Sequence, residues 1–304
     1  MKKILVIGSL NMDLVLEVEN MPLPGETIMG KSFMTSPGGK GANQAGSLGK
    51  LEAQLIMLGC VGNDSFGEQL LSSFSGVDTS RIKHTEIQPT GTAVIYVSRS
   101  GMNSIVVVPG ANSECDIDYL KENDDIFREC DAVLLQMEIP HEAVYYAIDR
   151  AHELGKTVIL NPAPAPDFIP DKILKKLDFI TPNETELAKL TGMPAETEEE
   201  ISAAAGVLAF STSGHVLVTL GERGVMLSDG KTDAIFPTLT VPVVDTTAAG
   251  DCFNAAFVYG MTKGNSISQS IKFANVAAAL SVSKKGAQSS LPTLAEVEAA
   301  AKQI

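Results

Sequence analysis

Short apolar runs alternate with helical stretches along most of the chain, and this alternation is the strongest constraint on its fold. From Ala53 onward the apolar runs are short and rich in β-branched residues, which favours strands. The predicted strands are 54–61, 132–137, 157–160, 178–181 and 216–220, and the predicted helices are 66–74, 141–154, 184–190, 249–261 and 267–283. Strands with continuous apolar sequence are buried on both faces. The pattern therefore predicts an α/β fold with an open, mostly parallel sheet and helices on both faces.

Two regions break this alternation. Residues 14–18 alternate Leu or Val with Glu, which is typical of a strand with one wet face. Residues 92–98 and 104–108 form a hairpin-like pair around Ser100 and Gly101. These strands predict a small antiparallel sheet, inserted from about 12–36 and 90–110 into a single α/β domain over 1–304. The sheet is interpreted either as a lid over the mouth of a site or as an edge extension of the main sheet.

Charge and cysteine content exclude several classes of protein. The chain has 23 Lys and Arg against 37 Asp and Glu, a net charge of −14, which argues against binding to nucleic acid. No apolar run of about 18 residues is present, so no membrane span is expected. Four scattered cysteines without a C-x-x-C pair indicate neither a disulfide framework nor a zinc site, which favours the cytoplasm. The first apolar run is interpreted as a β-strand rather than a signal peptide.

Polar residues follow the first predicted strand. Asn11 and Asp13 come soon after residues 4–7. Ligands of open parallel sheets bind at the carboxyl ends of the strands, so these side chains could bind sugar hydroxyls. The alternative is an Asx turn that only leads out of the strand.

A glycine-rich segment, residues 37–45, opens a predicted helix over 40–48. Its glycines allow close backbone approach, and the helix N-terminus offers free N–H groups. The spacing does not match the Walker phosphate loop. The segment suits a polyhydroxylated ligand at least as well as a phosphate, and a flexible loop with a helix cap is the structural alternative.

A run of small residues precedes the predicted helix 249–261. Ala248, Ala249 and Gly250 would place backbone N–H groups at the helix N-terminus, where they could form an anion hole. Asp251 lies beside them and could act as a general base towards a hydroxyl group. Alternatively, Asp251 only stabilises the first helical turn electrostatically.

A further motif lies where residues 178–181 lead into a predicted helix. Asn183 is a natural N-cap, and Glu186 stands three residues later, which indicates a capping box. A functional interpretation adds Glu186, directly or through water, to a network of Mg²⁺ and phosphate.

Taken together and in order, these motifs resemble those of the ribokinase-like carbohydrate kinase family over almost the whole chain. The resemblance rests on segments 11–13, 38–44, 161–164, 181–186, 219–221, 245–251 and 285–288. The chain departs from the usual residues of that family at Pro37, Thr247, Asn275 and Ser289. Each motif is weak alone, but the ordered set is specific.

The resemblance implies ATP-dependent phosphorylation of a sugar at a primary hydroxyl group, O5 in the case of D-ribose, which would give ribose 5-phosphate. It implies that Asp251 is the base and that Ala248, Ala249 and Gly250 form the anion hole. The sugar-binding positions correspond to Asn11, Asp13, Gly39, Lys40, Gly41, Asn43, Glu138 and Asp251. The nucleotide-binding positions correspond to Asn183, Thr219, Gly221, Gly224, Gly250 and Asn275.

The resemblance also implies Mg²⁺, with Glu186 in its network, and a monovalent cation such as K⁺. The positions of the monovalent-cation ligands correspond to Asp245, Thr247, Ser281, Lys284, Gly286 and Ser290, several of them through backbone carbonyls. A homodimer joined through the lid sheets is expected. Two alternatives stay open: a kinase for another small sugar such as deoxyribose, and a non-enzymatic sugar- or nucleotide-binding protein on the same fold.

Overall fold

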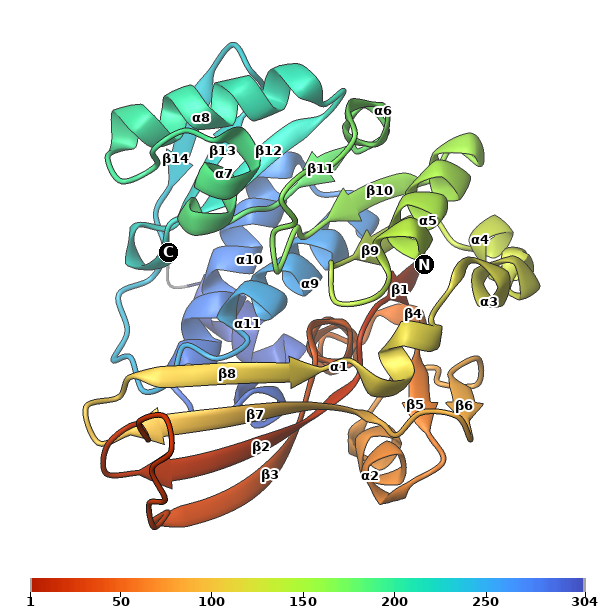
Figure 1. Ribbon diagram of the computed structural model, residues 1–304. Coiled ribbons are helices and arrows are strands. Elements are labelled where there is room, and N and C mark those ends of the chain that lie inside the picture. The colour runs from red at the N-terminus through yellow and green to blue at the C-terminus, as the bar shows by residue number, and fades with distance from the viewer. Residues whose placement is uncertain (1, 303–304) are drawn as a thin grey trace.

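A long twisted sheet runs through the computed structural model, which describes residues 2–302 (Figure 1). Within those residues the sheet has eight strands in the order β14-β13-β12-β11-β10-β9-β1-β4. The strands are β1 (Lys3–Ile7), β4 (Gln54–Leu58), β9 (Ala132–Leu135), β10 (Thr157–Leu160), β11 (Phe179–Ile180), β12 (His215–Thr219), β13 (Val225–Ser228) and β14 (Asp233–Phe236). The six strands from β4 to β12 are mutually parallel, which confirms the predicted fold class.

Two strands at one edge of this sheet were not predicted. β13 and β14 pair antiparallel to β12 and to each other. They follow β12 through a tight turn at Gly221–Arg223 and are only four residues long, so they carry little periodic signal.

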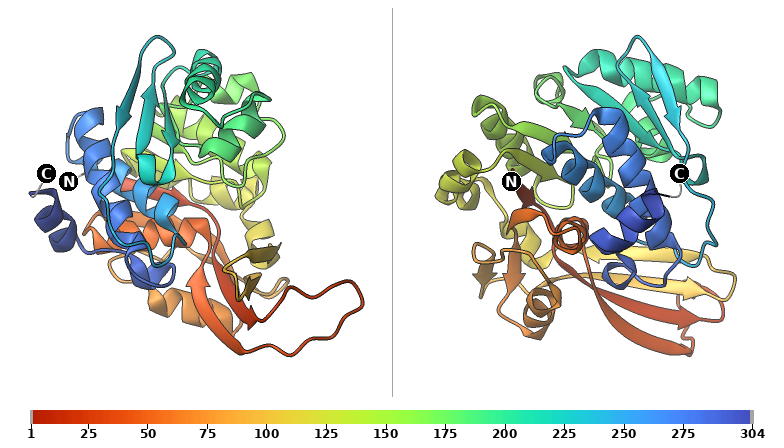
Figure 2. Two further views of the ribbon diagram at one scale, coloured as in Figure 1. Left: turned by 90° about the vertical axis from the view of Figure 1, so that its left-hand side faces the viewer. Right: turned by 180° about the vertical axis from the view of Figure 1, so that it is seen from behind.

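Helices cover both faces of the sheet, as the alternation predicts (Figure 2). Their apolar sides form two cores that the sheet separates. One face carries α3 (Ile117–Glu122), α4 (Asp124–Glu129), α5 (His141–Glu153), α6 (Asp171–Leu174), α7 (Glu184–Thr191) and α8 (Glu198–Ser211). The other face carries α1 (Lys40–Lys50), α2 (Ser65–Ser73), α9 (Ala249–Thr262), α10 (Ile267–Val282) and α11 (Leu294–Ala301). Because the strands are buried on both faces, they can be apolar throughout.

A second sheet projects from the body of the molecule, below the main sheet in Figure 1. In the described chain it has four strands in the order β3-β2-β7-β8, which are β2 (Asn11–Val18), β3 (Ser32–Gly38), β7 (Gly91–Ser98) and β8 (Asn103–Val108). The two outer pairs are antiparallel, whereas the central pair of β2 and β7 is parallel. It is separate from the main sheet, which settles the choice between a separate sheet and an edge extension. We call it the lid sheet.

The chain passes from β1 into the lid sheet with almost no connection. Asn11 and Asp13 are therefore residues of β2 and do not lie in a turn, contrary to the Asx-turn alternative. A separate two-stranded pair, β5 (Cys60–Gly62) with β6 (Lys83–Thr85), lies beside the lid sheet. Among residues 2–302, no helix is long and apolar enough to cross a membrane.

Candidate active site

The polar residues of the site gather at the carboxyl ends of the parallel strands. Ser9 follows β1, Glu138 follows β9, Asn161 follows β10, Asn183 follows β11, and Thr219 ends β12. Parallel strands end along one edge, so side chains far apart in sequence are brought into one row. This edge lies beside the lid sheet and the first turns of α1 and α9.

Glycines allow α1 to begin directly against the end of β1. Gly39 caps the helix with φ 90°, a conformation that favours glycine, and a Cβ there would lie 2.7 Å from the Asn11 nitrogen. A Cβ on Gly41 would lie 2.5 Å from the carbonyl carbon of Gly8. Substituents at these positions would push the helix away. The glycine-rich segment is therefore a point of close backbone packing that brings Lys40, Asn43 and Gln44 to the site.

Asp251 lies in the first turn of α9 and is 8% exposed. Its carboxylate accepts hydrogen bonds from two residues of α1. Asn43 Nδ2 donates to Oδ2 at 3.0 Å, and Gln44 Nε2 donates to Oδ1 at 3.0 Å. Burial raises the pKa of this carboxyl group, while Lys40 and the two amide donors oppose the rise. The arrangement suits a base that is held in place and is partly shielded from water.

The residues before Asp251 form the start of α9, where the anion hole of Ala248, Ala249 and Gly250 is predicted. Ala248 caps α9 in the left-handed conformation with φ 62°, which is costly for a residue with a Cβ and is typical of functional turns. The amides of Gly250 and Asp251 donate to no group among residues 2–302. Unpaired amides at a helix N-terminus attract negative charge, so this turn can bind a phosphate beside Asp251.

Acidic side chains surround the single lysine of the site. Glu138 Oε2 accepts from Ser9 Oγ at 2.6 Å and from the Lys40 amide at 3.0 Å. Burial disfavours the Lys40 ammonium, but Asp251, Glu138 and the other nearby carboxylates outweigh this effect and raise its pKa. Burial, followed by repulsion from Glu138 and Asp251, raises the pKa of Asp13 to about 7. Burial and mutual repulsion therefore disfavour the ionised forms of these carboxyl groups.

The raised pKa of Asp13 predicts a pH-dependent stability. Folding raises the pKa of this carboxyl group from 3.8 to about 7. The contribution of its protonation to the free energy of unfolding is therefore complete below the unfolded pKa and is lost as the pH rises through about 7. An asparagine side chain at position 13 could not ionise and would not show this pH dependence. We therefore expect the Tm of Asp13→Asn to rise relative to that of the wild type between about pH 5 and about pH 8. Calorimetric melting at both pH values measures this, and a constant difference in Tm would contradict it.

The predicted nucleotide-binding positions lie along the same edge, beyond Asp251. The backbone of Asn183 forms an isolated parallel β-bridge with Thr219. The side chain of Asn183 forms a complete capping box with Glu186, as predicted. Gly224 has φ 93°, and a Cβ there would lie 2.1 Å from the carbonyl oxygen of Phe236. The same oxygen accepts from Asn275 Nδ2 at 2.8 Å. The turn that contains Gly221 and Gly224 therefore lies beside Asn275. Gly224 and Asn275 also serve local packing against Phe236.

Asp245 connects the two loops that were assigned to a monovalent cation. Its Oδ1 accepts from the amide and the hydroxyl of Thr247 at 2.9 and 2.6 Å, and its Oδ2 accepts from the Gly286 amide at 2.9 Å. These bonds lower the pKa of Asp245 against the opposing effect of burial. The side chain of Lys284 turns away to pair with Glu296 at 2.8 Å. Only the backbone carbonyl of Lys284 is therefore suitable as a ligand.

The oxygens of Ser281 and Ser290 lie in the same region. Both side chains are buried, and their hydroxyl groups donate to Ala278 and Ala287 carbonyls at 2.8 Å. With their donors used, the hydroxyl oxygens and nearby carbonyls can only accept or coordinate. The predicted ligands are thus oxygens with one formal charge among them, a donor set that suits a large monovalent cation better than Mg²⁺. No cluster of three or more His, Cys, Asp or Glu suited to a metal ion occurs in residues 2–302.

Comparison with known proteins agrees with this geometry. Residues 1–294 match the family described as pfkB family carbohydrate kinase. The chain belongs to the pfkB family of carbohydrate kinases. The match covers the lid sheet, α1 and the Asp251 turn alike, so every part of the candidate site lies within the shared family sequence.

Individual members of the pfkB family are similar over nearly their full length. The chain is 40% identical over 297 residues to a ribokinase from Haemophilus influenzae, with 97% of each chain covered. It is 37% identical over 296 residues to a deoxyribokinase from Salmonella typhi, with 96% of each covered. The structure of Arabidopsis thaliana ribokinase complexed with ribose and ATP superimposes with a TM-score of 0.91 at 37% identity, covering 99% of each chain. The ribokinase-like fold predicted from the motifs is confirmed.

Several polar residues of this pfkB kinase site had no role assigned from sequence. Gln44 lies inside a recognised motif, but only the structure shows that its amide contacts Asp251. Gln136 directly follows the apolar residues of β9, and Thr181 follows β11 in the same way. Polar residues just after buried strands are the signal that could have identified them. Asn254 carries no such signal, because one polar residue in an apolar helix is common.

Proposed function

We propose that this pfkB kinase transfers the γ-phosphoryl group of ATP to O5 of D-ribose, forming ribose 5-phosphate and ADP. One observation carries the proposal: Asp251 is buried and held by two side-chain amides at a helix N-terminus where the Gly250 and Asp251 backbone amides have no partner among residues 2–302. A base next to an anion hole is the arrangement that phosphoryl transfer to an alcohol requires. The similarity to a ribokinase that binds ribose and ATP supports the choice of substrates.

Each group of residues has a part in the proposed reaction. The sugar lies among Asn11, Asp13, Asn43 and Glu138, close to Gly39, Lys40 and Gly41. Its O5 attacks the γ-phosphorus, the bond to the β-phosphate oxygen breaks, and the O5 proton passes to Asp251. The anion hole at Ala248, Ala249 and Gly250 and the Lys40 ammonium stabilise the charge on the transferred group. The lid sheet limits access of water, which would otherwise compete as acceptor.

The nucleotide is placed along the strand ends that lead away from Asp251. Asn183 and the residues from Thr219 to Gly224 bind the phosphates and ribose of ATP, and the region of Asn275 lies near the adenine. Glu186 would hold Mg²⁺ directly or through water, and the ion would supply positive charge that neutralises the phosphates. Burial raises the pKa of Glu186 even though the amide of Asn183 donates to it, so an incoming cation would stabilise its ionised form.

Deoxyribose is the second candidate acceptor, because the Salmonella relative is a deoxyribokinase of comparable similarity. The two sugars differ by one hydroxyl group, and we propose that Asp13 contacts it. A purely binding function is disfavoured by the buried base and by family membership.

A panel of substrates tests the proposed function. Pentoses, deoxyribose, hexoses and nucleosides are each incubated with ATP and Mg²⁺, and ADP release is scored together with the phosphorylated product. We expect the highest kcat/KM for ribose. A higher value for deoxyribose would select the alternative. If neither sugar raises ADP release above the background from water, a pentose kinase is refuted.

We further propose that K⁺ activates the enzyme from a site outside the substrate pocket. Asp245 joins the loop before the anion hole to the loop at Gly286. A cation at this junction would fix both loops and orient the amides of Ala248 to Gly250, so we expect it to raise kcat more than it lowers KM. Initial rates in K⁺ and in a bulky organic cation at matched ionic strength measure the effect. Equal rates in both, for the wild type and for Asp245→Ala, would exclude it.

A homodimer through the lid sheets is the assembly we propose. All residues of edge strand β8 are exposed, including Ile105, Val106, Val107 and Val108, which are 46–58% accessible. Phe33 and Met34 of the opposite edge are exposed as well. Such apolar surface on an unpaired edge favours association. We expect light scattering to report twice the monomer mass at micromolar concentration, and a monomer there would count against the interface.

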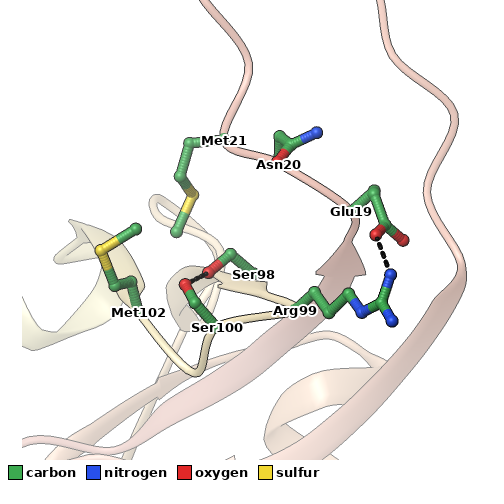
Figure 3. A pocket seen from close by; sticks show the side chains of 7 residues that line it. All are labelled: Glu19, Asn20, Met21, Ser98, Arg99, Ser100 and Met102. Atoms are coloured by element: carbon green, nitrogen blue, oxygen red, sulfur yellow. Dashed lines mark hydrogen bonds and ion pairs between the residues drawn. The ribbon is translucent and has the colours of Figure 1, made fainter.

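The far end of the lid sheet offers further surface for this contact. A hollow of about 450 Å³ lies between the end of β2 and the turn from β7 to β8 (Figure 3). Met21 and Met102 line it, and Arg99 pairs with Glu19 at 3.0 Å on its rim. This mixture of apolar walls and charged rim is typical of a contact surface and not of a phosphate site.

We assign the enzyme to the cytoplasm. All four cysteines are buried and free, as expected under reducing conditions. Cell fractionation followed by immunoblotting tests this assignment.

A further inference from the structure

A chain of buried amides connects Asp251 to the ends of three strands. Gln44 Nε2 donates to Asp251 Oδ1 at 3.0 Å and also to Asn161 Oδ1 at 3.2 Å. Gln136 Nε2 donates in turn to Gln44 Oε1 at 2.5 Å. Gln44 and Gln136 are fully buried. Gln44 therefore uses both amide hydrogens and its carbonyl oxygen, and it is the residue at which α1, β9, β10 and α9 meet.

The direction of these bonds follows from the charge on Asp251. An ionised carboxylate only accepts hydrogen bonds, so the NH₂ group of Gln44 must face it. The Gln44 oxygen then faces Gln136, whose NH₂ group must point back towards it. The Gln136 oxygen lies against Gly8 and accepts no hydrogen bond from any group in residues 2–302. The orientation that satisfies the carboxylate thus leaves one buried acceptor of the pair unsatisfied.

The same network returns to α9 at the anion hole. Asn161 Nδ2 donates to the Thr181 carbonyl at 3.1 Å, and Thr181 Oγ1 donates to Asn254 Oδ1 at 2.6 Å. Asn254 Nδ2 completes the path by donating to the Gly250 carbonyl at 2.9 Å. The path therefore begins at the Asp251 carboxylate and ends at the neighbouring peptide group. It fixes the base and the anion hole relative to each other through side chains of the sheet edge.

We propose that Gln44 is a positioning residue that holds Asp251 deprotonated and in a fixed orientation, and that Gln136 orients Gln44. The proposal rests on the proposed role of Asp251 as the base. Gln44 has no free polar atom for the sugar, since its amide and its oxygen are already bonded to protein groups. Its loss should therefore affect the chemical step and leave substrate binding nearly unchanged.

Other charges also act on Asp251, and all of them persist when Gln44 is replaced. Lys40 on α1 favours the ionised form, while Glu138 after β9, Asp13 on β2 and Glu186 on α7 disfavour it. Gln44 contributes a neutral hydrogen bond to the carboxylate. Removing that bond alone should raise the pKa of Asp251, because the ionised form loses a donor. Activity that depends on ionised Asp251 should then be lost at a higher pH.

The test is Gln44→Met in the full-length protein, since methionine keeps the volume and removes both the NH₂ group and the oxygen of the side-chain amide. We expect kcat for ribose to fall about 10- to 100-fold, as for the loss of one hydrogen bond to a charged group. The KM values for ribose and ATP should stay within about threefold. The acid limb of the kcat profile should move to higher pH. Gln136→Met, which removes only the support of Gln44, should show a smaller change in the same direction.

Asn123→Leu is the matched control. Asn123 is also a buried amide, and its Nδ2 donates to the Tyr119 carbonyl at 2.9 Å, far from the site at the junction of α3 and α4. We expect it to lower Tm without changing kcat or the acid limb. If Gln44→Met fails to fold, Gln136→Met decides the question by the same readouts. A kcat within twofold of the wild type, or a lower kcat with an unmoved acid limb, would overturn the positioning role.

The failure of this inference differs from the failure of the proposed function. Wild type that does not phosphorylate ribose refutes the ribose assignment, and the variants are then compared on the best sugar of the panel. Asp251→Asn that retains wild-type kcat refutes the base. An active wild type and an inactive Asp251→Asn, together with a near-wild-type kcat or an unmoved acid limb in Gln44→Met, refute the role of the amides specifically.

Discussion

Replacement of Asp251 by asparagine is expected to lower kcat by about 10²- to 10⁴-fold, the usual contribution of a general base. Asparagine has the same shape, so the packing of the first turn of α9 should survive. It cannot take the proton from the acceptor hydroxyl group. Its NH₂ group would also face a donor, because Asn43 and Gln44 both present Nδ2 or Nε2 to this side chain. The orientation of the whole amide network should therefore be disturbed as well.

Nucleotide binding distinguishes a chemical effect from a structural one in this variant. The anion hole consists of backbone amides, and removal of a nearby negative charge does not weaken their attraction for phosphate. We expect the Kd of ATP, measured by calorimetry, to remain within a few-fold of the wild-type value while single-turnover phosphorylation is lost. Retention of most of the wild-type kcat would rule out Asp251 as the base.

The second large effect is expected for Gly41→Ala. The new Cβ would lie 2.5 Å from the carbonyl carbon of Gly8 and 2.6 Å from the Ser9 nitrogen, and backbone atoms cannot rotate away. Helix α1 would have to move off the end of β1. We expect unfolding free energy to fall by about 1–3 kcal/mol, as in overpacked cores. We also expect kcat/KM to fall about 10²-fold, because Asn43 and Gln44 move away from Asp251 together with the helix.

Gly206→Ala is the matched control, because Gly206 lies inside α8 and a Cβ there would meet no atom within 4 Å. This variant should be neutral or more stable by about 0.5–1 kcal/mol, as expected for alanine in a helix interior. Denaturant unfolding and steady-state kinetics of both variants give the comparison. Similar behaviour of the two would show that the close approach of α1 to β1 is unimportant.

Local sequence signals predicted much of this fold. The prediction of helix 184–190 ended by Gly192 agrees with α7, where Gly192 has φ 68° and the Asn183–Glu186 capping box is complete. Strand 157–160 agrees with β10 in both ends. These features depend on neighbours in sequence, on caps and on apolar periodicity. The predicted start of a helix at Ala249 agrees with α9 for the same reason.

Features that depend on distant residues were missed. β13 and β14 are too short for a periodic pattern and owe their place to pairing with β12. The bond from Gln44 to Asp251 joins residues 207 positions apart, and no local signal can report it. Likewise, the parallel pairing of β2 with β7 inside the lid sheet follows from the path of the main chain and not from either strand.

The long separation between α1 and α9 has a consequence for the biosynthesis of the enzyme. The donors on α1 are made early, whereas Asp251 is added only after β14 and every other strand in the order of Figure 1. Both sheets can therefore begin to assemble on the ribosome around Asn43 and Gln44, whose side-chain amides would still lack the Asp251 carboxylate as acceptor. Helices α9 and α10 must then dock onto a waiting apolar face, a long-range step of the kind that slows folding. We therefore expect a nascent chain to gain its proposed catalytic base in one of its last folding events, and a chaperone that shields the uncovered face would protect the enzyme until then.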